Sequence, residues 1–544
     1  MSNFRNKSVD VHQFSMIPSA DIPRSRFNAQ SALKTTFDAG YLVPIYCDEV
    51  LPGDTFNTSC TLFGRLATPL FPIMDNLHMD TFFFFVPNRL IWDNWRQFMG
   101  QQDKPGDSTD FLVPQLVSPN GGFAVNSLYD YMGLPTVGQV DPGHSISVCA
   151  FWPRAYALIW NEWFRDENLQ DPIEFSTGDG PDSFSTFTLK RRGKRKDYFT
   201  GALPWPQKGE PVTLPFSTSA PVRSNGLNPL FSQYPSGFID KSLETSRTST
   251  PTGDVFRMDA SGVSVPEASA YLKFGSQTGL YADLSQATAA TVNQIRQSFQ
   301  IQKLLERDAR GGTRYTELVR SHFGVVSPDA RQQRPEYIGG GSVPININPI
   351  AQTSATTNQG GDTPLGNLAA MGTMLAHPHG FTYSATEHGV MLGMVRIRAD
   401  LTYHQRLHRM WSRRSRFDFF FPVFSHLGEQ AILNKEIYAT GTASDENVFG
   451  YQERWAEYRY KPSMITGLFK STSAGTVDAW HLAQRFNNLP TLSSDFIEDR
   501  PPVDRITAVG DAANGQQFLL DCFFNTTMAR PMPMYSTPGL IDHF

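Results

Sequence analysis

Residues 78–100 decide the fold of this chain and read His-Met-Asp-Thr-Phe-Phe-Phe-Phe-Val-Pro-Asn-Arg-Leu-Ile-Trp-Asp-Asn-Trp-Arg-Gln-Phe-Met-Gly. Residues 82–86 form a short run of bulky, β-prone side chains that Pro87 ends, which is typical of a strand buried on both faces. Beyond the proline the period becomes helical, and the apolar face of the predicted helix carries Trp92, Trp95 and Met99. We therefore predict a buried strand, a turn and a short amphipathic helix that ends at Gly100.

The same strand-like pattern, interrupted by proline, surrounds this stretch. Residues 41–74 have no helical period and are cut by Pro44, Pro52, Pro69 and Pro72. Strand patterns return over residues 389–403 and 418–424, while the three glycines 339–341 indicate a flexible turn. Short strands broken by proline favour an antiparallel barrel or sandwich over βαβ units.

Two longer segments have a helical period. Residues 153–166 place a stripe of aromatic side chains on one face, which is typical of a helix packed in a core or against another subunit. Residues 283–310 give the clearest helix, because Asp283 and Gln286 resemble a capping box and two glycines follow residue 310. At this length the helix would span about 40 Å.

The composition bounds the class of protein. Of 544 residues, 18% are charged and 12% are aromatic, which indicates extensive burial in a core or between subunits and excludes a disordered chain. The formal net charge is −5, so any contact with nucleic acid must be local or shared with a basic partner. The four cysteines are dispersed, which indicates free thiols from a reducing compartment. No signal peptide or membrane span is found, so we expect a soluble chain made in a cytosol, without membrane insertion.

The sequence offers no set of residues for catalysis. Residues 143–147, Gly-His-Ser-Ile-Ser, begin like a nucleophile elbow but lack its last glycine, and no nucleotide-binding motif is found. His404 and His408 have a spacing that could place two metal ligands on one helix face. No carboxylate accompanies them, and the arginines around them oppose a cation. We therefore predict no catalytic residue, no cofactor and no metal ion.

Two basic segments are candidates for nucleic-acid contact. The first 40 residues form a polar arm whose candidate side chains are Arg5, Lys7, Arg24 and Arg26. Residues 404–416 contain five arginines and no acid, and the candidates there are Arg406, Arg409, Trp411, Arg413, Arg414 and Arg416. Arginine forks suit phosphate and tryptophan can stack on a base. The alternatives are a frayed terminus for the arm and salt bridges to acidic neighbours for the cluster. A third basic run, residues 190–196, could be a nucleic-acid contact, a contact to an anionic partner, a nuclear signal or a solvated loop, and we favour a loop or subunit contact.

Several long sequence motifs resemble those of the major capsid protein of the small single-stranded-DNA phages, the Microviridae, and most closely those of its gokushovirus branch. The motifs are residues 82–95, Tyr156-x-x-Ile159-Trp160-Asn161-Glu162-Trp163-Phe164-Arg165-Asp166, and residues 302–307, 310–315 and 450–463. The resemblance covers about residues 1–200 and 275–544.

The resemblance implies a mainly β fold, an eight-stranded antiparallel jelly roll with large helical and loop insertions. We expect an N-terminal arm at 1–40 and the first part of the barrel domain at 41–204. A surface insertion at 205–273 would form an outer protrusion, and residues 274–544 would complete the barrel domain. This last part carries the helix 283–310 and an extended C-terminal tail.

The resemblance further implies a structural protein and not an enzyme. Many copies would form a small T=1 icosahedral shell around circular single-stranded DNA, assembled in the cytoplasm of a bacterial host. Its partners would be copies of itself, the genome with a small basic DNA-binding protein, minor virion or scaffolding proteins, and a host receptor bound through residues 205–273. The alternatives are an all-β carbohydrate-binding protein or enzyme, whose aromatics stack on sugars, and a non-capsid phage structural protein such as a tail or spike component.

Overall fold

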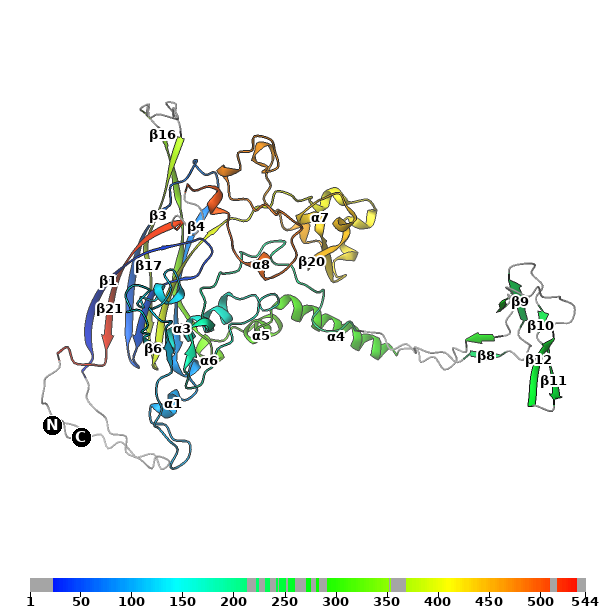
Figure 1. Ribbon diagram of the computed structural model, residues 1–544, viewed down its shortest axis with the longest axis horizontal. Coiled ribbons are helices and arrows are strands. Elements are labelled where there is room, and N and C mark those ends of the chain that lie inside the picture. The colour runs from blue at the N-terminus through cyan, green and yellow to red at the C-terminus, as the bar shows by residue number, and fades with distance from the viewer. Residues whose placement is uncertain are drawn as a thin grey trace. The chain divides into compact units, whose positions relative to one another are not determined.

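The computed structural model describes residues 23–212, 291–351, 353, 368–508 and 516–535, together with seven short strands between residues 222 and 282. The chain divides into two compact units (Figure 1). The larger comprises Met1–Pro206 and Asp308–Phe544, and the smaller is Gln207–Arg307. The smaller unit shares residues 207–273 with the predicted surface insertion at 205–273 and also includes most of the helix that follows.

Among the described residues, the larger unit is built on eight long antiparallel strands (Figure 1). In chain order they are β1 (Ser25–Phe37), β2 (Val43–Val50), β3 (Thr55–Leu66), β4 (Leu77–Pro87), β15 (Glu336–Pro344), β17 (Leu368–Ser384), β18 (Gly389–Ala399) and β21 (Phe518–Arg530). A ninth strand, β16 (Asn346–Ala351), pairs with β17 at one edge.

The eight strands pair as nested hairpins. The first pairs with the last, β1 with β21, and the second with the seventh, β2 with β18. The third pairs with the sixth, β3 with β17, and the two middle strands, β4 and β15, pair with each other. This nesting is the topology of a jelly roll, in which one long folded hairpin wraps into a barrel. The spatial order β1-β21-β3-β17-β15-β4-β18-β2 leaves the barrel nearly closed, and the predicted fold class is confirmed.

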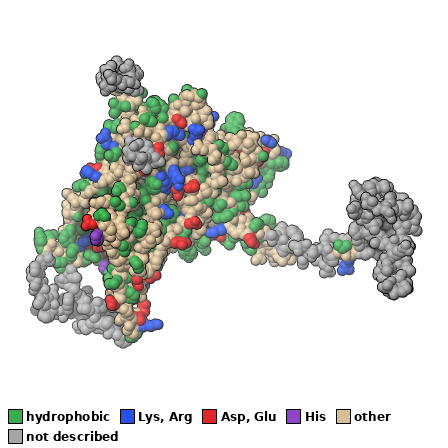
Figure 2. All heavy atoms as spheres, viewed as in Figure 1, with side chains coloured by type: hydrophobic (Ala, Val, Ile, Leu, Met, Phe, Trp, Pro, Cys, Tyr) green, Lys and Arg blue, Asp and Glu red, His purple; other side chains and the backbone are tan. Residues whose placement is uncertain are grey.

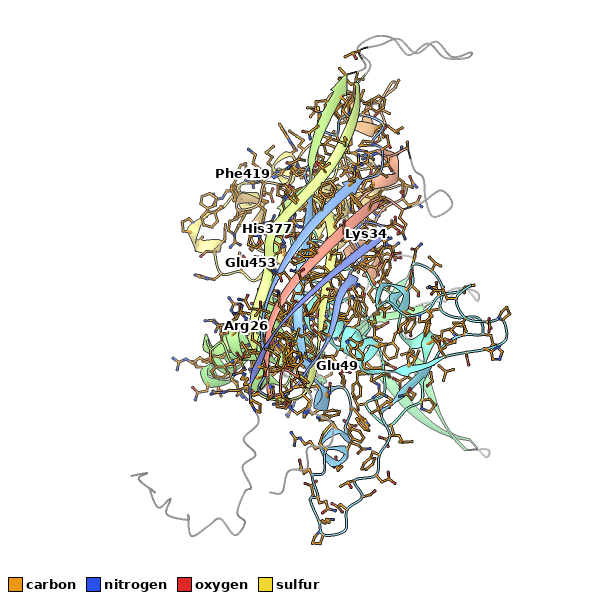
Figure 3. The ribbon with its side chains drawn as sticks, turned by 90° about the vertical axis from the view of Figure 1, so that its left-hand side faces the viewer. Arg26, Lys34, Glu49, His377, Phe419 and Glu453 are labelled. Carbon is orange, nitrogen blue, oxygen red and sulfur yellow. The ribbon has the colours of Figure 1, made fainter. Side chains whose placement is uncertain are left out.

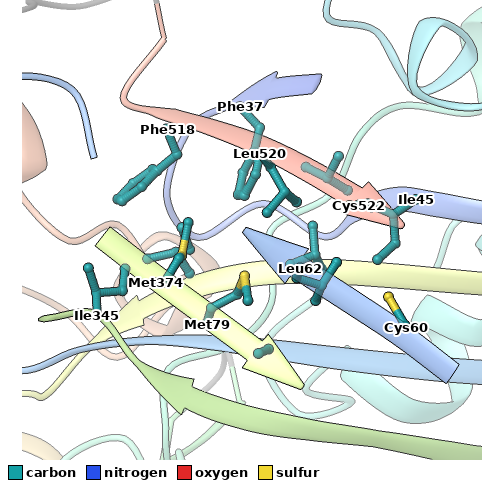
Figure 4. Packing of buried hydrophobic residues seen from close by; sticks show 14 of the residues in the cluster. Phe37, Ile45, Cys60, Leu62, Met79, Ile345, Met374, Phe518, Leu520 and Cys522 are labelled. Carbon is teal, nitrogen blue, oxygen red and sulfur yellow. The ribbon is translucent and has the colours of Figure 1, made fainter. Parts of the chain in front are cut away.

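Strand β4 is buried on both faces, as predicted. Phe83 and Phe85 point into the barrel, where they join the main core, and Phe84 and Val86 point outward into a second core. Figure 4 shows the interior packing, in which Leu62, Met79 and Met374 point into the space between the strands. The period-2 alternation of a strand divides one phenylalanine run between the two cores.

Helical segments cover the outer face of β4 and β18. The turn after β4 holds Trp92, which is fully buried, and leads to α1 (Trp95–Phe98). This helix is a single turn, shorter than predicted, and Met99 beyond it is 48% exposed. Helix α3 (Phe151–Ile159) continues as a π-helical turn, Trp160–Phe164, and its aromatic face packs in the second core, as predicted.

A bidentate ion pair anchors this layer. The Arg154 guanidinium is fully buried and contacts both carboxylate oxygens of Asp182, at 2.7 Å each. It also donates to the carbonyl oxygen of Ile91 at 2.9 Å. The pair therefore ties α3 to the turn after β4.

Apart from the long helix α4, the remaining elements are short. The described helices include α2 (Leu128–Tyr131), α4 (Val292–Gly311), α5 (Tyr315–Phe323), α6 (Asp329–Gln332), α7 (Asn434–Ile437) and α8 (Ser494–Ile497). The described short strands of the larger unit are β5 (Gln115–Val117), β6 (Ser147–Cys149), β7 (Asp182–Ser183), β19 (Glu429–Leu433) and β20 (Val448–Glu453). Those of the smaller unit are β8 (Val222–Ser224), β9 (Leu230–Tyr234), β10 (Lys241–Ser242), β11 (Glu244–Thr250), β12 (Gly253–Asp259), β13 (Tyr271–Phe274) and β14 (Leu280–Ala282). None of the described helices has both the length and the apolar character that a bilayer span requires.

Two predicted boundaries were wrong. Helix α4 begins at Val292, later than the predicted residue 283, and Thr291 and Gln294 cap it by exchanging side-chain to backbone hydrogen bonds. The predicted cap at Asp283 and Gln286 lies outside the described residues. Residues 25–37, which were predicted to belong to an arm over residues 1–40, form β1 and pair with β21 along the whole length of that strand. Its largely exposed, polar residues resembled an arm.

Two predicted local structures were also wrong. Residues 339–341 lie inside β15 and do not form a flexible turn. A Cβ atom on Gly340 would lie 2.1 Å from the carbonyl oxygen of Thr81, so glycine allows β15 to approach β4 closely. Residues 418–424 form 3₁₀ turns, Arg416–Asp418 and Pro422–Phe424, in place of the predicted strand.

We expect Phe83→Ala to lower the free energy of unfolding by about 3–5 kcal/mol, because Phe83 is 1% exposed and its removal leaves a cavity inside the barrel. Phe63→Ala is the matched control, since Phe63 on β3 of the same barrel is 48% exposed. Urea unfolding of the full chain followed by tryptophan fluorescence measures both. Equal losses in the two variants would contradict the assignment of Phe83 to the core.

Candidate assembly and nucleic-acid interface

The basic cluster of residues 404–416 lies in the insertion between β18 and β21. This insertion, residues 400–517, has a hydrophobic core of its own, to which it contributes Tyr403, Ile432, Ile437 and Phe449. The cluster runs along the outside of this core as loops and one 3₁₀ turn, Arg409–Ser412. Each arginine therefore faces either back into the insertion or out to solvent.

Arg406 and Arg409 face inward. Arg406 donates to the carbonyl oxygen of Pro462 at 2.6 Å. Arg409 donates to the carbonyl oxygen of Ala431 at 2.7 Å and forms an ion pair with Glu436 at 3.0 Å. Burial raises the pKa of Glu436, whose side chain is 3% exposed, and the charge of Arg409 opposes that rise. Both arginines therefore support the fold of the insertion.

Arg413 is held in a similar way. It pairs with Glu457 at 3.3 Å and lies 4.4 Å from the ring centroid of Tyr458 and 5.1 Å from that of Phe419. Glu457 is 3% exposed in its side chain, so the pair is largely removed from water. For Arg409 and Arg413 the alternative interpretation, salt bridges to acidic neighbours, describes the structure.

Three of the six candidate side chains in this cluster point to solvent. Trp411 is 72% exposed, and Arg414 and Arg416 are also exposed. Asp418 fixes the turn between them by accepting the backbone N–H groups of Arg414 and Ser415 at 2.9 and 2.7 Å. These hydrogen bonds lower the pKa of Asp418, so the carboxylate stays charged and holds the turn. We name Trp411, Arg414 and Arg416 the exposed triad.

The two histidines of the cluster do not form a metal site. His404 is buried, and His408 accepts the backbone N–H of Met410 through Nδ1 at 3.1 Å. Burial, followed by neighbouring arginines, lowers the pKa of both rings. No group of three or more His, Cys, Asp or Glu side chains suited to a metal ion occurs in the described part of the chain.

An aromatic surface lies beside the exposed triad. Between 44% and 60% of each side chain is exposed at Phe417, Phe419, Phe420 and Phe421, and Val423 is 79% exposed. Figure 3 shows Phe419 on a lobe at the side of the barrel. Large exposed apolar patches with a polar rim mark surfaces that bind other proteins.

A second apolar surface lies on the barrel itself. The outer face of strands β1, β21, β3 and β17 is turned to the viewer in Figure 3 and carries Lys34 and His377. Its large exposed side chains are Phe63, Leu375, Leu519 and Phe523, each between 44% and 61% exposed. The opposite side of the barrel is covered by the helical layer, whereas this face is open in the single chain.

Comparison with known proteins identifies the family. The model of the family described as capsid protein (F protein) matches residues 15–540. This chain belongs to the capsid protein (F protein) family. It is 46% identical over 542 residues to capsid protein VP1 of Bdellovibrio phage phiMH2K, covering 98% of each chain. It is 41% identical to capsid protein VP1 of Chlamydia phage 1, again over 98% of each, and 36% identical to that of Spiroplasma virus 4, over 97% of this chain and 98% of the relative.

The family gives the two apolar surfaces a role. A capsid protein is a structural component of the virion that assembles with copies of itself into a shell. Exposed aromatic and aliphatic surfaces on one chain are then surfaces that other chains can cover. The resemblance to a phage capsid protein, inferred from residues 82–95 and the other motifs, is confirmed.

The capsid chain does not bring all the predicted nucleic-acid residues together. Arg24 donates to the side-chain oxygen of Thr55 at 2.5 Å, and Arg26 lies in β1. Figure 3 places Arg26 well away from Phe419 and the insertion. Arg5 and Lys7 lie outside the described residues. The aromatic surface at residues 417–421 was missed as a surface, because a phenylalanine run in sequence is typical of a buried strand.

The distinction between the paired arginines and the exposed arginines of the cluster can be tested by matched substitutions. We expect Arg409→Gln to lower the free energy of unfolding by about 3 kcal/mol, because it leaves the buried Glu436 without its cation. Arg414→Gln removes the same charge from an exposed position and should change stability by less than about 0.5 kcal/mol. Thermal and urea unfolding of the two variants measure the difference. Equal stability of both would show that the Arg409–Glu436 pair does not support the insertion.

Proposed function

We propose that this chain is the major coat subunit of a small T=1 icosahedral shell that encloses circular single-stranded DNA. The single observation that carries the proposal is the pair of open apolar surfaces on a jelly-roll barrel whose relatives are named capsid proteins. Such a subunit performs no reaction, and its function is to bind its own copies. We place its assembly in the cytoplasm of a bacterial host.

The exposed triad is the proposed contact to the genome. Arg414 and Arg416 offer charge to phosphate, and Trp411 offers a ring on which a base can stack without regard to sequence. Because the chain carries a net charge of −5, a small basic DNA-binding protein would supply the rest of the neutralisation. Arg5, Lys7, Arg24 and Arg26 remain candidates for a second contact.

The other proposed partners follow from the organisation of the chain. Residues 205–273 are proposed to project from the outer surface and bind a host receptor. Minor virion or scaffolding proteins are proposed to guide the copies into a closed shell. Many weak contacts suit this assembly better than a few tight ones, because wrongly placed subunits can then dissociate.

Electron microscopy of the purified native assembly tests the proposal directly. We expect uniform small icosahedral particles whose nucleic acid resists nuclease and is single-stranded DNA. Trimers or fibres without a closed shell would favour a tail or spike component. A monomer that binds saccharides and protects no DNA would favour the carbohydrate-binding alternative.

The DNA contact has its own test. Replacing Arg414 and Arg416 with glutamine should reduce the log–log salt slope of single-strand binding by about 1.4, because each phosphate contact contributes roughly 0.7. Lys34→Gln is the control, since Lys34 is an exposed base on the barrel, 76% exposed in its side chain. Filter binding of labelled oligonucleotide over a range of salt gives the slopes. An unchanged slope in the double variant would exclude these two arginines as the DNA contact.

A further inference from the structure

A basic cavity lies within the larger unit, apart from the arginine cluster described above. Its volume is about 640 Å³, and it is bordered by β4, β18, the end of α3 and the loops at residues 192–196 and 312–317. Figure 2 shows Lys and Arg side chains gathered near the middle of the visible face, where Figure 1 labels α8. Ile497 at the end of α8 lines the cavity.

The cavity has an excess of positive charge. Nine of its lining residues are Lys or Arg, and four are Asp or Glu. Each of the four acids already pairs with a base that also lines the cavity. Asp80 lies 3.3 Å from Arg396 and 3.0 Å from Arg398. The other pairs are Asp166 with Lys196, and Glu167 and Glu317 with Arg314.

Four lining bases form no direct ion pair with a carboxylate among the described residues: Arg165, Arg192, Lys194 and Arg195. The charges of Asp80 and Asp499 still act on Arg192, and that of Asp499 acts on Lys194. The Nε atom of Arg165 is buried and has no hydrogen-bond partner in the described part of the chain. Arg195 is exposed at the rim. An unpaired donor that is shielded from water costs free energy, which a bound acceptor would restore.

Arg192 is partly buried against aromatic rings. Its guanidinium lies over the rings of Phe82 and Phe164, 4.9 and 5.1 Å from their centroids. Burial, followed by the nearby charge of Arg396, lowers the pKa of Arg192 to about 10, against the opposing charges of Asp80 and Asp499. The guanidinium groups of Arg192 and Arg396 thus repel each other at the wall of the cavity, Asp80 and Asp499 oppose that effect, and a further anion would stabilise both groups.

Lys194 adds a second confined charge. Its ammonium group donates to the carbonyl oxygen of Phe496 at 2.5 Å, and burial lowers its pKa to about 8. Asp499 lies close by, 3.7 Å from Arg396. Burial raises the pKa of Asp499, and Arg396 and Lys194 oppose that rise. Because Asp499 is one carboxylate beside two bases, Arg396 and Lys194, this wall keeps a net positive charge.

We propose that this cavity binds a phosphate group, either of a free phosphate or nucleotide or of a nucleic-acid strand. The planar guanidinium group of an arginine can donate two hydrogen bonds to the oxygens of a phosphate. Several such groups together offer more donors than one carboxylate can accept. The volume exceeds that of one phosphate group, so a nucleoside can be accommodated beside it. This inference does not depend on the exposed triad or on the shell, because it concerns a cavity within one chain.

Calorimetric titration of the full-length chain, purified free of nucleic acid, tests the cavity. The ligands are inorganic phosphate, deoxyadenosine monophosphate and a short oligothymidylate. We expect at least one to bind, and Arg192→Gln and Arg195→Gln each to weaken that ligand at least about tenfold, as the loss of one charge-assisted hydrogen bond implies. Arg96→Gln, an exposed arginine outside both the cavity and the exposed triad, is the matched control and should leave the affinity unchanged.

The pattern of ligands separates the two sources. Binding of phosphate or the monophosphate points to a free ligand, and binding of the oligonucleotide alone points to a strand. No binding of any ligand, or equal affinities in all variants, would overturn the proposal. Arg195→Gln keeps the test valid if Arg192→Gln fails to fold, because Arg195 is exposed. The titration uses unassembled chain, so failure to form particles would leave its result unaffected.

Discussion

The burial of β4 on both faces is the constraint on which the rest of the structure depends. Its alternating side chains fill the barrel on one side and require a cover on the other. A strand in a solitary barrel would have one face in water. The helical layer covers the outer face of β4. It is inserted directly after β4 and before β15, the two middle strands of the nested hairpins. Arg154 and Asp182 then fix that layer by a buried pair that also reaches the turn after β4.

Nested pairing also decides where the chain can vary. Because β4 and β15 are hydrogen-bonded neighbours, the residues between them leave and return at one end of the barrel, and a long insertion there leaves the strand register intact. The same holds for residues 400–517 between β18 and β21, which build a separate core. The barrel is thereby a frame that presents two elaborated insertions and one open sheet face. A protein that works by covering its surfaces with copies of itself needs such a frame.

The sequence predicts best where the pattern is local. The run at residues 82–86 and the aromatic stripe of α3 are periodic over a few residues, so burial could be inferred from them. The errors occur where a partner far along the chain decides the outcome. Residues 25–37 become a strand through pairing with β21, and the glycines of β15 serve a close approach to β4. Likewise Arg409 is neutralised by Glu436, and Arg413 by Glu457, 44 residues away. The composition of residues 404–416 was enough to find the basic cluster. Only the fold shows which of its arginines are paired with a carboxylate and which are exposed.

That separation explains how a chain of net negative charge can still face an anion. Arginine inside an ion pair contributes little field outside the pair, since the two charges cancel at a distance. The field near this chain is therefore set by bases that form no such ion pair. Two groups of these bases among the described residues are Arg414 and Arg416 on the rim of the insertion, and those around Arg192 in the cavity. The first is open to solvent and is screened by salt, whereas the second is sheltered and retains its charge–charge interactions. A ligand held at the sheltered site should therefore stay bound at ionic strengths that release one held at the rim.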